Sequence, residues 1–327
     1  MITLENQFMF AEIDLDVGGD IRTLVAKKIK KNLLLEISPP KISSMDNKEL
    51  SCEEKFLAKY KGGWQLMFPN AGYCSTHNGI FYNYHGSVWD STWELVELDK
   101  THAKIALELD AFGFSLVRTL TLIESKFIVQ DEILNKSKNK QLVIWGHHPA
   151  FSEELLASVT RITINANRLE IINQLPENKP LPIKLNRGTQ GSLLFEPLPG
   201  FSGSFLGIIS GFYDCENMVS IDCPKFGISI NMNWDVEIFR NAWFWFENLN
   251  VKNDYWPNGI STFAIEPCST STNMGYANSV TNLSNLIELE GFESKRGHIV
   301  IEVLQCDSDI GDSISTVTGM EPIHEAV

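Results

Sequence analysis

The segment Phe114-Ser115-Leu116-Val117-Arg118-Thr119-Leu120-Thr121-Leu122 decides the fold class of this 327-residue chain. Every second side chain from Phe114 onward is large, and the side chains between them are Ser, Val and Thr. Alternation with a period of two is typical of a β-strand that buries one face. Residues Phe127–Leu134 follow after a short gap and are predicted to form a further strand.

Short candidate strands recur on both sides of this segment, bounded by Gly, Asn, Asp and Pro. They cover residues 105–109, 142–145, 161–164, 228–234 and 298–304. The polar run Asn135–Lys140 predicts a hairpin turn between two strands. Helical segments do not alternate with the strands, so a parallel α/β sheet is not expected.

Two stretches have helical character, and a third is interpreted as a long loop. Ser44–Tyr60 is predicted to form a polar helix capped by Ser44 or Asp46, and Glu153–Val159 one or two helical turns. The loop is the Pro- and Gly-rich stretch Leu175–Gly203. We therefore predict an all-β fold, with one large antiparallel β-sandwich domain over residues 1–305 and an acidic, flexible tail over residues 306–327.

The charge balance excludes some classes of partner. The chain has 27 basic and 41 acidic residues, which gives a formal net charge of −14. Nucleic acids and anionic membranes are bound through Lys and Arg, so we expect neither as a partner. The basic residues within Lys27–Lys31 and Lys136–Lys140 are expected to be solvated surface. The 19 Phe, 8 Trp and 7 Tyr fit both packed sheets and a sugar-binding cleft.

The cysteines and the N-terminus predict a cytoplasmic protein. None of the six cysteines forms a C-x-x-C pair or has the spacing of a zinc knuckle. Residues Met1–Asp16 lack the continuous apolar segment of a signal peptide, and no run of 18 apolar residues predicts a membrane span. Reduced thiols are therefore expected. The oligomeric state is not specified by the sequence.

Two histidines and one carboxylate stand in short segments far apart in the sequence, and they suggest acid–base chemistry. The segments are Tyr84-His85-Gly86, His147-His148-Pro149 and Ile265-Glu266-Pro267. Imidazole and carboxylate groups deliver and remove protons near neutral pH. On a strand, His147 faces away from His148, so only one of them can face a given pocket. Phosphate-binding loops, dinucleotide-binding loops, H-E-x-x-H and G-x-S-x-G motifs are absent from the sequence.

Taken in order, these segments resemble the motifs of the galactose mutarotase-like superfamily, which includes the aldose 1-epimerases. The resemblance extends from about residue 17 to residue 305 and rests on six segments: Gly62–Gly72, Tyr84–Gly86, Arg118–Leu122, Gly146–Phe151, Ala264–Cys268 and Leu289–Glu293. Galactose mutarotases carry an arginine just before their H-G pair, where this chain has Pro69-Asn70-Ala71-Gly72. The chain therefore resembles a divergent branch.

The resemblance implies an isomerase that interconverts sugar anomers and needs no cofactor and no metal. Glu266 is implied to be the general base that removes the proton from the anomeric hydroxyl. His148 is implied to be the acid that protonates the ring oxygen. His85 is implied to hydrogen-bond the sugar and to share the acid role.

The expected partner is a small-molecule sugar or sugar derivative. Trp243 and Trp245, on one face of an aromatic run, are candidates for stacking on a sugar ring, and Asn70 for hydrogen-bonding its hydroxyls. Two other functions remain open. One is a non-catalytic carbohydrate-binding protein on the same fold. The other is a metal-dependent enzyme with His85, His148 and Glu266 as ligands.

Overall fold

The structure is a computed structural model. It describes residues 1–38, 49–165, 168–175, 183–187, 192–197, 203–210, 218–248, 256, 259–271, 273–282 and 286–306. Within these ranges, strands dominate and helices are few and short. The acidic tail predicted for residues 306–327 lies outside the described residues, except for Cys306.

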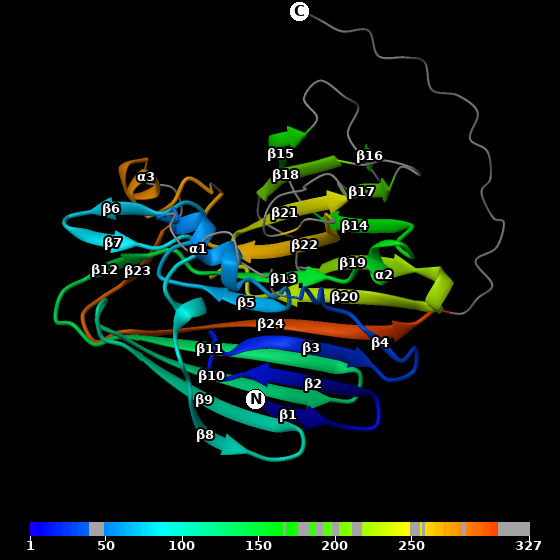
Figure 1. Ribbon diagram of the computed structural model, residues 1–327, viewed down its shortest axis with the longest axis horizontal. Helices are drawn as coiled ribbons and strands as arrows, with labels where there is room; N and C mark the ends of the chain where they lie inside the picture. Colours follow the sequence, from blue (N-terminus) through cyan, green and yellow to red (C-terminus); the bar gives the residue numbers. More distant parts are fainter. Residues whose placement is uncertain are drawn as a thin grey trace, which may run out of the picture.

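Two antiparallel sheets of ten strands each make up most of the described part of the chain (Figure 1). The first sheet contains, in spatial order, β1 (Ile2–Glu5), β2 (Met9–Asp14), β3 (Asp20–Ala26), β5 (Trp64–Met67), β13 (Gly146–Phe151), β22 (Ser261–Cys268), β21 (Asn241–Asn248), β18 (Gly203–Ser210) and β15 (Arg168–Leu175), with β4 (Lys31–Asn32) beside β3. The second contains β16 (Ile183–Arg187), β17 (Ser192–Pro197), β14 (Arg161–Asn165), β19 (Met218–Cys223), β20 (Ile228–Trp234), β24 (Ser294–Gln305), β11 (Lys126–Asn135), β10 (Phe114–Ile123), β9 (His102–Leu109) and β8 (Glu94–Leu98).

Small elements complete the described structure. They are the two-stranded sheets β12 (Gln141–Val143) with β23 (Ile287–Leu289) and β6 (Ser75–His77) with β7 (Ile80–Tyr82), the helices α1 (Cys52–Lys59), α2 (Glu153–Leu156) and α3 (Tyr276–Thr281), and the 3₁₀ turns η1 (Val88–Asp90) and η3 (Pro224–Phe226). In Figure 1 the helix α3 lies near β6 and β7, at the end of the molecule away from β20.

The core lies between the two large sheets, which makes the fold a β-sandwich. Rings from opposite sheets meet there: Trp64 of β5 lies 6.1 Å from Phe127 of β11, between ring centroids. Buried side chains of both sheets form one continuous apolar cluster. The all-β, antiparallel fold class predicted from the sequence is therefore confirmed.

Strand β10 shows why the alternating segment predicts this fold. Phe114, Leu116 and Leu120 are buried, and the residues between them are partly exposed. The large residue Arg118 is also fully buried, because Asp131 lies directly opposite it on β11. A buried arginine requires such a partner, since an unpaired charge in the core is very costly.

Two local predictions from the sequence differ from the structure. The stretch Leu175–Gly203 is not one long loop, because the strands β16 and β17 lie within it and pair with each other. The Pro and Gly content favoured the prediction of a loop. Strand pairing was not predicted because it is not visible in local composition. In the described part of the Ser44–Tyr60 stretch the helix begins at Cys52, and its cap is Ser51, in a capping box with Glu54; the predicted caps Ser44 and Asp46 lie outside the described residues. The predicted turn at Glu153 is confirmed as α2.

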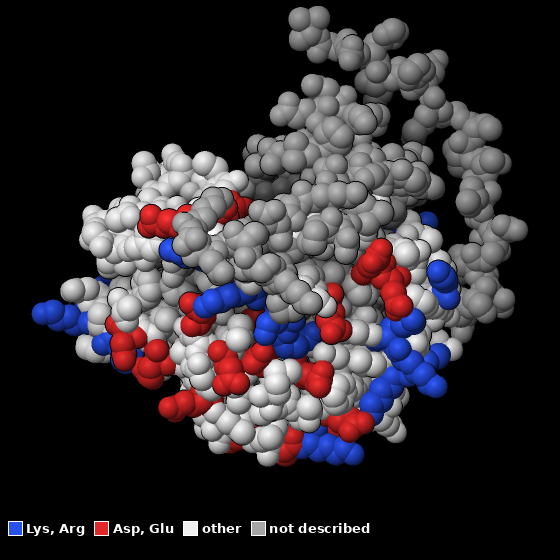
Figure 2. Space-filling view, viewed as in Figure 1, with Lys and Arg blue, Asp and Glu red and all other residues white. Residues whose placement is uncertain are grey.

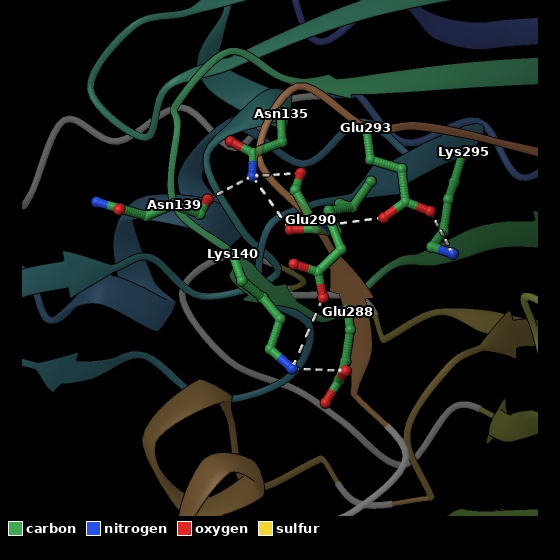
Figure 3. Close-up of polar contacts among 8 residues, drawn as sticks. Asn135, Asn139, Lys140, Glu288, Glu290, Glu293 and Lys295 are labelled. Carbon is green, nitrogen blue, oxygen red and sulfur yellow. Dashed lines mark hydrogen bonds and ion pairs between the residues drawn. The ribbon is translucent and has the colours of Figure 1, made fainter.

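The connection predicted at Asn135–Lys140 is present, but it joins β11 to β12, which belongs to another sheet, so it is not the predicted hairpin; one side chain holds it in place (Figure 3). The amide of Asn135 donates hydrogen bonds to the carbonyl oxygens of Asn139, Leu289 and Glu290, at 2.8, 3.1 and 3.0 Å. Lys140 forms an ion pair with Glu288 at 2.8 Å. The turn is therefore attached to the segment that precedes β24.

Acidic and basic side chains are interspersed on the face of the molecule shown in Figure 2. Lysines of both basic runs form ion pairs near the surface: Lys27 lies 2.5 Å from Glu5, and Lys136 lies 2.8 Å from Asp110. Such surface pairs contribute little to stability. A helix long and apolar enough to cross a membrane does not occur among the described residues.

Candidate functional site

A cavity of about 280 Å³ lies over the middle of the first sheet, and we call it the central pocket. The strands β13, β21 and β22 supply one wall, while α1 and the loop segments near Gly72 and His85 supply the opposite one. The lining residues are Glu53, Phe56, Leu57, Tyr60, Gly72, Tyr73, Tyr84, His85, His148, Trp243, Trp245, Glu247, Trp256, Glu266 and Asn273.

Consecutive histidines of β13 face opposite ways, as the alternation of a strand requires. His147 points into the core, where its Nε2 lies 3.1 Å from Asp131 Oδ2 and its Nδ1 accepts a hydrogen bond from Trp64 Nε1 at 3.2 Å. His148 lines the central pocket. The sequence-based choice of His148 over His147 as the pocket residue is thus matched by the placement of the two side chains.

His148 and Glu266 form the titratable pair of the pocket. They lie on neighbouring strands, β13 and β22, and the distance from His148 Nε2 to Glu266 Oε1 is 3.6 Å. Both side chains are almost fully buried, with 8% and 3% of their surfaces exposed. The separation is slightly longer than a hydrogen bond, so a small movement brings the two groups into proton-transfer distance.

Burial shifts the pKa values of this pair in opposite directions. It raises the pKa of Glu266 to about 8, and it lowers the pKa of His148 to about 4. In each case the charged form is disfavoured because water is excluded. Between these values the pair holds one proton in total, and no charge has to be buried in the empty pocket.

His85 reaches the pocket from a loop, and its ring lies 5.6 Å from that of His148, between centroids. The backbone N–H of Gly72 donates to His85 Nδ1 at 3.3 Å. That bond fixes the proton of the neutral ring on Nε2, which is then a donor. Burial, and to a lesser extent His148, holds the pKa of His85 well below its usual value.

The loops around His85 depend on two glycines. Gly72 and Gly86 have φ angles of 76° and 87°, in the left-handed region that favours glycine. A Cβ atom at Gly72 would lie 2.0 Å from the carbonyl oxygen of Asn273, and one at Gly86 would lie 2.3 Å from that of Phe68. These close approaches hold His85 against the rest of the pocket wall.

The helix α1 covers the pocket with aromatic rings. The ring centroid of Phe56 lies 5.1 Å from that of His85, and that of Tyr60 lies 5.9 Å from that of His148. At its start the helix is tied to the pocket loop by a disulfide between Cys52 and Cys74. The expectation of reduced thiols is therefore wrong for these two cysteines, because the fold brings together residues whose sequence spacing gave no signal of pairing.

Both tryptophans singled out in the sequence line the pocket. Trp243 lies opposite Glu266 in the pairing of β21 with β22, and Trp245 lies opposite Ala264. The indole N–H of Trp243 donates to the carbonyl oxygen of Thr270 at 3.0 Å, which fixes the ring. The intervening Phe244 is buried in the sandwich core. The aromatic run therefore has one pocket face and one core face.

Asn70 does not lie among the residues that line the pocket. Its side chain is fully buried, and its amide donates to the carbonyl oxygens of Tyr73 and Asn83 at 3.0 and 2.7 Å. These bonds join the two segments that carry the pocket residues Tyr73 and Tyr84. Binding of a sugar hydroxyl by Asn70 stays a prediction from the sequence.

The sequence analysis missed several polar groups of the pocket, among them Glu247 and Tyr60. Glu247 follows Trp243 and Trp245 with a spacing of two, so alternation along the strand was the available signal. Tyr60 follows the last residue of α1, and its hydroxyl is buried with no hydrogen-bond partner among the described residues. Within the described ranges, no group of three or more His, Cys, Asp or Glu side chains is placed to hold a metal ion.

Similar structures have been solved, although the sequence matches no protein-family model and no curated protein. The Slr1438 protein from Synechocystis sp. PCC 6803 is 16% identical, with a TM-score of 0.64 over 93% of this chain and 95% of that one. A galactose mutarotase-like protein from Lactobacillus casei ATCC 334 is 16% identical, with a TM-score of 0.57 over 93% and 99%. Another, from Clostridium acetobutylicum, is 15% identical, with a TM-score of 0.57 over 93% and 94%.

These likenesses establish the fold. The chain has the galactose mutarotase-like β-sandwich, and its sequence is divergent from those of its structural neighbours. The resemblance inferred from the ordered motifs is confirmed at this level.

Proposed function

We propose that the chain is an aldose 1-epimerase-like isomerase that interconverts the anomers of a sugar. One observation carries the proposal: a buried carboxyl and a buried imidazole, Glu266 and His148, lie 3.6 Å apart in a pocket lined with aromatic rings. Opening a hemiacetal requires one proton to leave the anomeric hydroxyl and one proton to reach the ring oxygen. A base and an acid side by side meet that requirement.

The proposed reaction keeps its protons in balance. Glu266, as carboxylate, takes the proton of the anomeric hydroxyl, and His148, as imidazolium, gives a proton to the ring oxygen. The bond between C1 and the ring oxygen breaks as C1 becomes a carbonyl carbon. Rotation about the C1–C2 bond and reversal of the proton transfers then close the ring as the other anomer. His85 Nε2 is the proposed donor to a sugar oxygen.

The proton count of the empty pocket is compatible with this cycle. With the pKa of Glu266 near 8 and that of His148 near 4, the pair holds one proton near neutral pH. Moving that proton from Glu266 to His148 creates the carboxylate and the imidazolium without changing the net charge. A bound sugar, whose hydroxyls solvate both charges, favours that transfer.

Exchange NMR of anomer interconversion across a panel of aldoses tests the proposal, with wild type compared with Glu266→Gln and His148→Asn. Acceleration by wild type that both variants lose is the expected result. If aldoses bind and no exchange is accelerated above buffer, the chain is a non-catalytic carbohydrate-binding protein on this fold. If a chelator abolishes the activity and a transition metal restores it, the metal-dependent alternative holds.

A cytoplasmic location stays a prediction. Disulfides are typical of oxidising compartments, so the Cys52–Cys74 bond weighs against it. Quantifying free thiols in protein purified under alkylating conditions decides the redox state in the cell.

A further inference from the structure

Glu247 is a second buried carboxyl of the central pocket, and the proposed reaction does not use it. Only 7% of the residue is exposed. Its Oε1 accepts a hydrogen bond from Trp245 Nε1 at 3.1 Å. Its Oε2 is buried and has no hydrogen-bond partner among the described residues. An unsatisfied buried carboxyl oxygen is costly, which points to a group that the ligand supplies.

The charges of the pocket favour a cation. Its described lining contains three carboxyls, Glu53, Glu247 and Glu266, and no lysine or arginine. Burial raises the pKa of Glu247 to about 7, and the hydrogen bond from Trp245 opposes that shift. A cation beside the carboxylate would restore its ionised form. A phosphorylated sugar would find no basic side chain among the described lining residues.

Aromatic rings lie beside Glu247, and two of them, Trp245 and Tyr60, also lie near His148. The ring of Trp245 lies 6.4 Å from that of Trp256 and 6.5 Å from that of Tyr60, and the last two lie 6.4 Å apart, all between centroids. A cation is attracted to the face of an aromatic ring, most strongly where water is excluded. Rings of this kind together with a carboxylate form a suitable environment for a substituted ammonium group.

The register of the sheet places Glu247 away from the reacting carbon. Trp243 is the residue opposite Glu266, and Glu247 lies four residues further along β21, opposite Thr262. At about 3.3 Å per residue, the two positions are ~13 Å apart along the strand. Both side chains line the central pocket, so a sugar whose C1 lies at Glu266 can approach Glu247 only with its far end, and not with C1 or C2.

We propose that the central pocket takes an aldose with a protonated amino group at the end remote from its anomeric carbon, and that Glu247 receives this ammonium group. Glu247 is then a specificity-determining residue. The inference rests on the proposed function for the orientation of the sugar, because Glu266 marks the position of C1. It adds a substrate class, the cationic amino sugars.

Binding measured by titration calorimetry at pH 6.5 tests this inference independently of turnover. The probes are 4-amino-4-deoxyglucose, 6-amino-6-deoxyglucose, their N-acetyl derivatives and glucose. We expect at least one amine to bind about tenfold more tightly than glucose, and its N-acetyl derivative to lose that advantage. Glu247→Gln should remove the preference. Glu247→Asp, which keeps a shorter carboxylate, should retain part of it, and it serves as the second variant if the Gln variant does not fold.

Glu94→Gln is the control, because it removes an exposed carboxyl on β8, outside the pocket. It should retain the preference for the amine. The inference is overturned if glucose binds or is converted and neither amine binds more tightly. It is also overturned if Glu247→Gln weakens amine and glucose equally. If none of the aldoses binds or is converted, the proposed function fails together with it.

Discussion

The core side and the pocket side of β13 each place a histidine beside a buried carboxyl, but the pKa values of the two carboxyls are shifted in opposite directions. On the core side, Arg118, Asp131 and His147 form a closed network in which Arg118 makes two hydrogen bonds to Asp131, at 2.7 and 3.0 Å. On the pocket side, His148 and Glu266 lie 3.6 Å apart, and among the described residues no cation lowers the pKa of the carboxyl. The pKa of Asp131 is lowered to about 2, chiefly by Arg118 against the effect of burial, whereas that of Glu266 is raised.

The contrast separates polar groups that stabilise the fold from those available to a ligand. Burial alone does not distinguish them, because both sets are almost fully enclosed. The difference is whether partners within the chain satisfy each group. A closed network contributes to the folded state, while an open one is stabilised when a ligand completes it.

The largest expected effect comes from replacing each of the two neighbouring histidines in turn. His148→Asn should lower the rate of anomer exchange by ~10²–10⁴-fold, because it removes the proposed acid. His147→Asn should lower stability instead, and the folded fraction should keep its rate of exchange. Exchange NMR on both variants, normalised to folded protein by circular dichroism, measures this. Loss of exchange in folded His147→Asn with a normal rate in His148→Asn would reverse the assignment.

The closed network is tested by removing one charge from it. Asp131→Asn should destabilise the protein by about 3–5 kcal/mol, because Arg118 is left buried without its counter-charge. The matched control is Glu132→Gln on the same strand. Glu132 pairs with Arg296, whose side chain is 67% exposed, so its loss should cost less than about 1 kcal/mol. Urea unfolding followed by tryptophan fluorescence gives both values, and similar losses in the two variants would contradict the distinction.

The pocket side lacks a closed network, and its covering helix is attached covalently. Cys52→Ser should lower the free energy of unfolding by about 3 kcal/mol, as expected for a closed loop of this length. Cys306→Ser, which removes a free thiol, serves as the control and should leave stability nearly unchanged. Thermal unfolding with and without reductant measures the effect. A wild-type protein whose melting temperature does not respond to reductant would count against the disulfide.

The smallest effect is a pH dependence specific to the open side. Because the folded pKa of Glu266 is raised to about 8, the folded state holds a proton that the unfolded state has lost. Its contribution to stability therefore falls as pH rises from about 4.5 to about 8, by at most about 1.4 kcal/mol per pH unit, and levels off above 8. The lowered pKa of His148 acts only below about pH 6.5. Between pH 6.5 and 8, the unfolding free energy of Glu266→Gln should depend less on pH than that of wild type. Equal slopes in the two proteins would refute the raised pKa of Glu266.

The sequence predicts the sandwich because alternation is a local property. Strands such as β10 and β20 show their buried face within a single run of residues. It does not predict the partner of Arg118, because Asp131 becomes its neighbour only through the register of β10 with β11. The strands β16 and β17 were missed for the same reason, since their pairing is absent from their composition.

The candidate site divides in a similar way. His85, His148 and Glu266 stand in recognisable segments, and the fold brings all three into one pocket. Glu247 follows an aromatic run that was interpreted only as a stacking surface. Its Oε2 is buried without a hydrogen-bond partner among the described residues, which the sequence does not show. Asn70 was chosen for its residue type, and the structure places it behind the lining, bound to two backbone carbonyls.

Gly146, at the start of β13, has a consequence for misfolding. A slip of β13 by one residue would move one of His147 and His148 into the place of the other, and that replacement alone meets little resistance because the two side chains are identical. A slip also moves a side chain into the place of Gly146, where a Cβ atom would lie 2.9 Å from Met67 Cε and 3.0 Å from Cys268 Sγ. The smallest residue of the strand therefore opposes a one-residue slip in either direction, each of which would put one histidine in the place of the other.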